Sequence, residues 1–132
     1  MTSISERTVL VIDDDPTQCL LIADSLRDTG YDVHTAASGV EGYDLARRVI
    51  PDLIMLDVMM PYIDGFNICC ELGLNPRTAH IPVILMTGLQ EPEAMIQGST
   101  AGAVDFITKP IDWPALPSRI AHVLDCVTMP AL

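Results

Sequence analysis

The sequence of 132 residues predicts one α/β domain, in which a parallel sheet is covered by helices on both faces. Three observations lead to this prediction. Short apolar runs alternate with longer amphipathic stretches, and most of the runs lack the polar alternation of a half-exposed strand. The chain is 49% hydrophobic, which is enough for a substantial core. No repeat, low-complexity tract or linker divides it, so we expect a single domain over residues 1–132 with no output domain.

Five apolar runs are expected to form the strands of this sheet. Each run has about the length of a buried strand, and most are rich in Val, Ile or Leu. The runs are Val9–Ile12, Val33–Ala36, Leu53–Leu56, Val83–Met86 and Val104–Ile107.

Five helices are expected between and after these strands. In the first, Cys19, Ile22 and Leu26 lie on one face together with Ala23, and Gly30 supplies a stop. The second opens with the capping-box pattern Ser38-Gly39-Val40-Glu41.

The remaining three helices differ in how clearly the sequence marks them. The third follows Asp64 and ends near Gly73, and the fourth, over about 91–100, is weakened by Gly98. The fifth has a clear apolar face, formed by Leu116, Ile120, Val123, Leu124 and Val127.

Charge and composition exclude several classes of protein. A formal net charge of −11 argues against direct binding to nucleic acid or to an anionic membrane. The N-terminus is polar, and no apolar run approaches the ~18–20 residues needed to span a bilayer. We therefore expect a cytoplasmic protein. Its four cysteines lack metal-ligand spacing, and their apolar neighbours favour small buried core residues.

Polar side chains follow four of the five expected strands. Asp13-Asp14-Asp15 follows the first strand, Asp57 the third, Thr87 the fourth and Lys109-Pro110 the fifth. In open α/β sheets, ligands bind at the carboxyl ends of the strands. These residues are therefore the candidates for a functional site.

Clustered aspartates indicate a cation site. Carboxylates 4 Å apart repel by roughly 4 kcal/mol per pair at an effective dielectric constant of 20, and a cation offsets that repulsion. Oxygen ligands without His or Cys point to Mg²⁺. A second interpretation has about even odds for Asp13–Asp15 alone, namely that they cap the helix beginning near Pro16. Asp57 at another strand end favours the site.

Lys109 and Thr87 fit phosphate chemistry at the same edge. An ammonium group can hold a phosphoryl oxygen as a point charge, and a hydroxyl can donate to one. Taken singly, a surface lysine and a turn-forming threonine are the simpler interpretations. A cis Lys109-Pro110 bond is compatible with a strand end that enters a turn.

At these residues the sequence resembles the receiver domains of bacterial two-component response regulators. The resemblance covers about residues 8–127 and is specific in the combination and order of its motifs. They are Val11-Ile12-Asp13-Asp14-Asp15-Pro16, Leu56-Asp57-Val58-Met59-Met60-Pro61-Tyr62-Ile63-Asp64-Gly65, Val83-Ile84-Leu85-Met86-Thr87-Gly88 and Gly102-Ala103-Val104-Asp105-Phe106-Ile107-Thr108-Lys109-Pro110.

The resemblance implies a flavodoxin-like receiver fold with strand order 2-1-3-4-5, and a role for each matching residue. Asp57 would accept phosphate from a sensor histidine kinase or a phosphotransfer protein. Mg²⁺ would be bound directly by Asp14, through water by Asp13, by the backbone carbonyl of Met59, and by Asp57 itself. Thr87 and Lys109 would contact the attached phosphoryl group. Phe106 would change rotamer with Thr87, by packing alone, since it lacks a hydroxyl.

The resemblance also implies partners and an output surface. The fourth helix, fifth strand and fifth helix would form the surface for a partner or a homodimer. As a regulatory domain, the chain would catalyse only its own phosphorylation and dephosphorylation at Asp57. Its Phe106–Arg119 stretch looks like receivers fused to cyclic-dinucleotide enzymes.

Three other classes of protein share parts of this pattern. A haloacid-dehalogenase-type phosphatase would use Asp13 as nucleophile, because Asp13-x-Asp15-x-Thr17 fits that motif, but the later acidic pair is missing. A flavodoxin-type flavin carrier is excluded, because three aspartates would repel its phosphate. A degenerate receiver used only for protein contacts ranks low, because all the acceptor-site groups are present.

Overall fold

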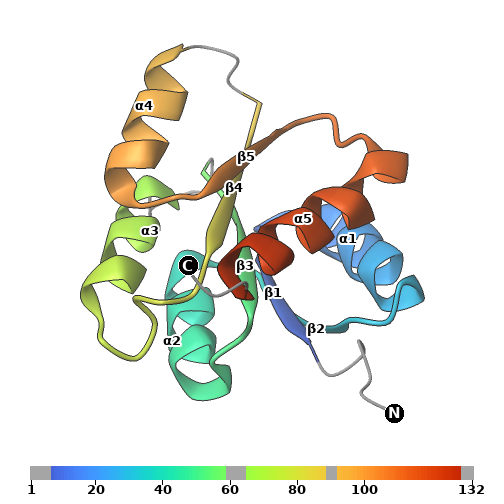
Figure 1. Cartoon of the computed structure of the whole chain (residues 1–132), viewed down its shortest axis with the longest axis horizontal. Coiled ribbons are helices and arrows are strands. Elements are labelled where there is room, and N and C mark those ends of the chain that lie inside the picture. Colours follow the sequence, from blue (N-terminus) through green and yellow to red (C-terminus); the bar gives the residue numbers. More distant parts are fainter. Residues whose placement is uncertain (1–6, 59–64, 89–91, 129–132) are drawn as a thin grey trace.

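The computed structural model describes residues 7–58, 65–88 and 92–128, in which strands and helices alternate along the chain (Figure 1). A short 3₁₀ helix at Trp113–Ala115 precedes the last helix. The strands are β1 (Thr8–Ile12), β2 (Asp32–Ala36), β3 (Leu53–Asp57), β4 (Val83–Thr87) and β5 (Asp105–Thr108); the helices are α1 (Pro16–Asp28), α2 (Gly39–Val49), α3 (Gly65–Leu74), α4 (Pro92–Ala101) and α5 (Leu116–Thr128).

The five strands form one parallel sheet in the order β2-β1-β3-β4-β5, as the resemblance implies. The register brings the carboxyl ends of the strands to a common edge. Ile12 pairs with Leu56, Asp57 with Met86, and Thr87 with Thr108. The residues that directly follow or end β1, β3, β4 and β5 therefore lie close together, which positions the candidate site.

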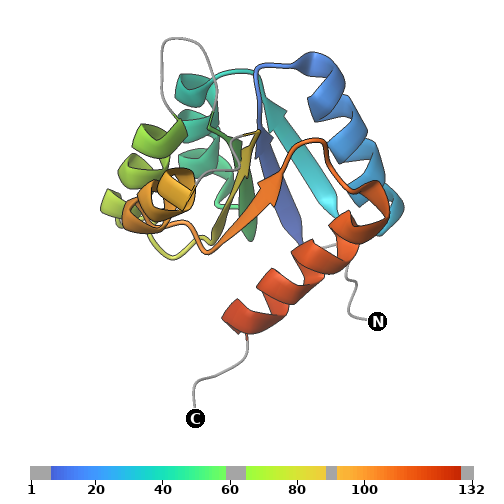
Figure 2. The ribbon, with the colours of Figure 1, turned by 90° about the horizontal axis from the view of Figure 1, so that it is seen from above.

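Helices cover both faces of the sheet, with α1 and α5 on one side and α2, α3 and α4 on the other (Figure 2). Alternate side chains of β1 point to opposite faces of the sheet. Val9 and Val11 pack in the cluster with α1 and α5, whereas Leu10 and Ile12 pack in the cluster with α2 and α3. All four are fully buried, and each such side chain contributes about 1.5–3 kcal/mol of transfer free energy. Burial on both faces explains why the three central strands, β1, β3 and β4, lack polar alternation, whereas the edge strand β2 is partly exposed.

Capping residues set the first two helices as the sequence predicts. Asp15 caps α1, since its Oδ1 accepts hydrogen bonds from the backbone N–H of Thr17 (3.0 Å) and Gln18 (3.4 Å). Ser38 Oγ accepts from the N–H of Glu41 at 3.1 Å, and the Glu41 carboxylate reaches back to the N–H of Ala37 at 2.8 Å. This reciprocal pair is a variant of the capping box.

Element boundaries differ slightly from the prediction at the end of the sheet. β5 begins at Asp105 and includes Thr108, whereas the apolar run suggested Val104–Ile107. Val104 is 53% exposed, because it still lies in the turn that enters the strand. α4 covers Pro92–Ala101, close to the predicted span, and the buried face of α5 consists of the predicted residues Leu116, Ile120, Val123 and Leu124; the side chain of Val127 lies outside the described part.

The prediction that the cysteines are buried holds for only two of them. Cys19 and Cys69 are buried, but Cys70 and Cys126 are exposed. Adjacent positions on a helix point about 100° apart, so apolar neighbours in sequence do not place Cys70 on the buried side of α3. Among the described helices, none combines the length and the apolar character that crossing a membrane requires.

Candidate functional site

Three carboxylates meet at the carboxyl edge of the sheet, where β1 and β3 end. One side-chain oxygen from each of Asp13, Asp14 and Asp57 lies within 4.8 Å of the others. Asp13 is completely buried, Asp57 is 3% exposed, and Asp14 is exposed. The cluster follows from the register, because Ile12 and Leu56 are paired and the next residue on each strand is an aspartate.

Lys109 reaches this cluster from the end of β5. Its Nζ lies 3.3 Å from Asp13 Oδ2 and 3.2 Å from Asp57 Oδ2, with the lysine side chain 28% exposed. The backbone N–H of Lys109 donates to the Thr87 carbonyl at 2.8 Å, which fixes the end of β5 beside β4. The Lys109–Pro110 peptide bond is cis. Lys109 and the three aspartates therefore lie together, as their positions at the strand ends predict.

The charges of the cluster are not balanced by the lysine alone. Burial raises the pKa of Asp13, and the charge of Asp57 adds to this effect, while the Asp15 N–H and the Lys109 ammonium oppose it without overcoming it. Burial by itself would lower the pKa of Lys109, but the charges of Asp57 and Asp13 raise it above its ordinary value. Lys109 therefore stays protonated, and three carboxylates face one ammonium group.

The acidic triplet after β1 is divided between two tasks. Asp15 caps α1, so the capping interpretation is right for that residue. Asp13 and Asp14 instead face the cluster with Asp57. Asp13 also supports the turn, because its Oδ1 accepts a hydrogen bond from the Asp15 N–H at 3.0 Å.

The donor set fits a hard divalent cation. All three side chains offer carboxylate oxygens, and two of them are buried with excess negative charge between them. Within the described residues, Asp13, Asp14 and Asp57 are the one set of three or more Asp, Glu, His or Cys side chains whose ligand atoms lie close enough together to hold a metal ion. Met59, the predicted backbone ligand, lies outside the described residues.

Thr87 and Phe106 occupy adjacent strands beside this cluster. Thr87 ends β4 and is 3% exposed. Phe106 lies on β5, opposite Leu85 in register, and its ring packs partly buried against the core cluster on the α2–α4 side of the sheet. Thr87 is therefore the polar residue at the end of β4, and Phe106 lies three positions before Lys109.

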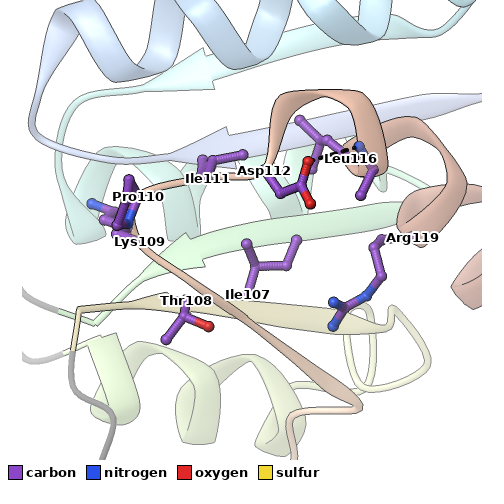
Figure 3. Close-up of a pocket in the computed structure, with 9 residues that line it drawn as sticks. Ile107, Thr108, Lys109, Pro110, Ile111, Asp112, Leu116 and Arg119 are labelled. Carbon is purple, nitrogen blue, oxygen red and sulfur yellow. Dashed lines mark hydrogen bonds between the residues drawn. The ribbon is translucent and has the colours of Figure 1, made fainter.

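Arg119 is a structural link that the sequence did not reveal. Its Nη2 donates to the Phe106 carbonyl at 2.6 Å and to Asp105 Oδ2 at 3.0 Å, which ties α5 to β5. A pocket of about 240 Å³ lies between them, with Lys109 at one end and Arg119 at the other (Figure 3). A single arginine on an amphipathic helix carries no sequence signal of such a role.

Gly65 is a second feature that sequence reasoning missed. Its N–H donates to the Val58 carbonyl at 3.2 Å at the start of α3. A Cβ atom at this position would lie 2.5 Å from Val58 Cα and 3.0 Å from the Asp57 carbonyl carbon. α3 thus approaches the backbone of Asp57 more closely than any side chain would allow.

The family model "Response regulator receiver domain" matches residues 9–121 of the chain. The DNA-binding dual master transcriptional regulator RpaA of Synechocystis is 44% identical over 116 residues, which are 88% of this chain and 48% of RpaA. The response regulator PleD of Caulobacter vibrioides is 45% identical over 85% of this chain and 25% of PleD. Protein PilH of Pseudomonas aeruginosa is 34% identical, over 88% of this chain and 96% of PilH.

Solved structures agree with the sequence relatives. A putative response regulator from Chloroflexus aurantiacus has a TM-score of 0.85 and 34% identity, covering 90% of this chain and 98% of the other. The chemotaxis protein CheY4 of Vibrio cholerae has a TM-score of 0.85 and 29% identity, covering 89% of this chain and 98% of the other. These matches do not support the haloacid-dehalogenase interpretation. The chain spans about half of RpaA and a quarter of PleD, and it belongs to the receiver domain family of two-component response regulators.

Proposed function

We propose that the chain is a phosphoacceptor switch, in which Asp57 takes a phosphoryl group from a sensor histidine kinase or a phosphotransfer protein in a Mg²⁺-dependent reaction. One observation carries the proposal. The Asp57 carboxylate is 3% exposed, lies 3.2 Å from the Lys109 ammonium, and has Asp13 and Asp14 oxygens within 4.8 Å. The candidate acceptor carboxylate, the oxygen ligands for a cation and a fixed positive charge thus lie together at one edge of the sheet.

Asp13, Asp14 and Asp57, with the Met59 carbonyl, are the proposed Mg²⁺ ligands. When bound, Mg²⁺ supplies positive charge that offsets the carboxylates and the phosphoryl oxygens. The fit rests on the hard oxygen donors and on the negative charge that Lys109 leaves uncompensated.

The phosphoryl transfer to Asp57 requires little covalent chemistry from the protein. The Asp57 carboxylate attacks phosphorus, the P–N bond of the donor phosphohistidine breaks, and its electron pair stays on the imidazole nitrogen, which takes up a proton. A carboxylate is a weak nucleophile, so position and charge dominate the rate. Lys109, already placed beside Asp57, can hold a phosphoryl oxygen, and the Thr87 hydroxyl can donate to another.

Phosphorylation of Asp57 would change the surface formed by α4, β5 and α5 through movements of Thr87 and Phe106. The new group adds about −1 to −2 charge and strong acceptor oxygens, which draw Thr87 inward. Phe106 can respond by packing, and its neighbours on α4, β5 and α5 would form the surface for a partner or homodimer. Arg119 supports this, because it joins β5 to α5 at the Phe106 carbonyl.

The remaining expectations follow from this role. The chain would be a single receiver domain over residues 1–132 in the cytoplasm, regulatory rather than enzymatic, without direct contact to nucleic acid or membrane. Since a probable cyclic di-GMP phosphodiesterase of Vibrio cholerae is a relative, we include a cyclic-dinucleotide pathway among its outputs. RpaA and AfsQ1 favour transcriptional control as the alternative output.

Incubation with acetyl phosphate tests the proposal. The chain should gain one acid-labile phosphate only with Mg²⁺, and borohydride reduction followed by mass spectrometry should place it on Asp57. Asp57→Asn should abolish the modification, whereas Asp24→Asn, on the exposed side of α1, should leave it unchanged. Phosphate on Asp13 would instead support the phosphatase interpretation, and no modification would contradict the switch.

A further inference from the structure

We propose that Gly98 is the positioning residue that couples the Phe106 ring to α4, so that a methyl group at this position biases the phosphorylation switch. This inference rests on the proposed function and deepens it. It assigns a role to a glycine that lies inside a helix, where glycine is less favourable than alanine.

The contact is tighter than a side chain at position 98 permits. A Cβ atom on Gly98 would lie 2.7 Å from Phe106 Cζ and 2.8 Å from Leu85 Cδ1, and it would also meet Phe106 Cε1. Gly98 is buried, so the ring rests directly on the helix backbone. The Phe106 ring therefore occupies the space that a side chain at position 98 would fill.

The same ring links the helix to the phosphoacceptor edge of the sheet. Leu85 and Phe106 are register partners on β4 and β5, and these strands lead to Thr87 and Lys109, respectively. The Phe106 carbonyl is held by Arg119 of α5. The backbone of Phe106 is thus anchored, while its ring is the part that touches α4.

Two movements would relieve a methyl group at position 98. Either the ring leaves α4, or α4 moves away from the sheet. The atoms that would be met are the ends of two side chains and not backbone, so the change displaces groups without disrupting the chain. Because either movement departs from the observed structure, the methyl group raises the free energy of the arrangement in which the Asp57 carboxylate is paired with Lys109.

By thermodynamic linkage, this displacement changes the affinity of the chain for a phosphoryl mimic, which can be measured. A phosphoryl group on Asp57 competes for Lys109 and draws Thr87 inward, and it thereby favours a rearranged ring and α4. A substitution that raises the free energy of the paired arrangement must then tighten the binding of a phosphoryl mimic. Coupling of the usual size for two linked sites corresponds to roughly fivefold or more.

The experiment measures the binding of beryllium fluoride with Mg²⁺ by titration calorimetry to four versions of the 132-residue chain: wild type, Gly98→Ala, Phe106→Ala and the double variant. We expect Gly98→Ala to bind roughly fivefold more tightly or more. In the Phe106→Ala background the methyl group should have a clearly smaller effect, because the two ring atoms are gone and only Leu85 Cδ1 remains to be displaced. Unchanged or weaker binding, or an equal effect without the ring, would overturn the inference.

Gly73→Ala is the matched control. Gly73 also lies in a helix, α3, but a Cβ atom there would have no atom within 4 Å, so only helix propensity changes. Hydrogen exchange separates the two effects: it should slow in α3 of Gly73→Ala but accelerate in α4 of Gly98→Ala. Slower exchange in α4 would contradict the contact. If the wild-type chain bound no beryllium fluoride, the proposed function would fail, and the exchange measurement would still test the contact.

Discussion

Asp13→Asn should stabilise the metal-free protein while abolishing its response to Mg²⁺. Asparagine keeps the Oδ1 that accepts the Asp15 N–H at 3.0 Å, so the turn after β1 is retained. It removes a fully buried negative charge that lies within 4.8 Å of Asp57. The substitution therefore isolates the electrostatic role of Asp13 from its structural one.

The magnitude follows from three opposing contributions. Repulsion between Asp13 and Asp57 is at least about 3.5 kcal/mol at 4.8 Å and an effective dielectric constant of 20, and the attraction of Lys109 at 3.3 Å is about 5 kcal/mol. These nearly cancel, so the desolvation of a buried carboxylate, several kcal/mol, decides the sign. We expect a net gain of roughly 1–3 kcal/mol in the free energy of unfolding.

Urea unfolding at neutral pH, with EDTA or with saturating Mg²⁺, measures both effects. In EDTA the variant should be more stable than the wild type, and Mg²⁺ should stabilise only the wild type. Asp24→Asn, at an exposed position of α1, is the control and should change neither value. A variant less stable than the wild type in EDTA would refute the reasoning, because it would show that the ion pair outweighs desolvation.

The pH dependence provides an independent check on Asp13. Burial raises its pKa, so the protonated form favours the folded state. That stabilisation is fully present below the unfolded-state pKa of about 3.9 and is lost as pH rises through the higher folded-state pKa. The stability difference between Asp13→Asn and the wild type should therefore grow over this window and stay constant above it. A difference independent of pH would mean that Asp13 acts without its charge.

Three further outcomes are expected. Lys109→Ala should destabilise the metal-free protein by roughly 2–4 kcal/mol in urea unfolding, because two buried carboxylates lose their counter-charge; equal stability would contradict the ion pairs. Gly65→Ala should lower stability by roughly 2–4 kcal/mol and slow phosphorylation by acetyl phosphate, since a Cβ atom there meets backbone, whereas Gly73→Ala should do neither. Iodoacetamide should label Cys70 and Cys126 in the native protein, and it should spare the two buried thiols, whose pKa burial raises to about 11 (Cys19 and Cys69); labelling of all four by mass spectrometry would show that the core opens readily.

The sheet and the polar site could be predicted because both depend on short-range patterns. A buried parallel strand needs an unbroken apolar run, and β3 and β4 consist of such runs with every residue buried. The residue after each run must then lie at a common edge. This reasoning placed Asp13, Asp57 and Lys109 together without any knowledge of the register, and the ion pairs at 3.2 and 3.3 Å have the expected partners.

The contacts between elements could not be predicted in the same way. Cys70 lies beside buried Cys69, and only the orientation of α3 on the sheet decides which thiol faces the core. Arg119 bonds to the Phe106 carbonyl across two elements, and nothing in either local pattern selects that pair. Such contacts depend on where whole helices dock, which a window of neighbouring residues does not contain.

Glycines show why local propensity can point to the wrong cause. In the sequence, Gly98 reads as a defect that weakens the fourth helix, because alanine would be favoured by about 1 kcal/mol there. In the structure, the Phe106 ring packs directly against the backbone of Gly98. The unfavourable helix propensity of glycine in α4 is therefore offset by packing against β4 and β5. At Gly73 an added Cβ atom would have no atom within 4 Å, so no packing of this kind accounts for that glycine. The role of a glycine inside a helix can therefore be assigned only when its surroundings are known, and the two positions differ because a Cβ atom at Gly98 would meet Phe106 and Leu85.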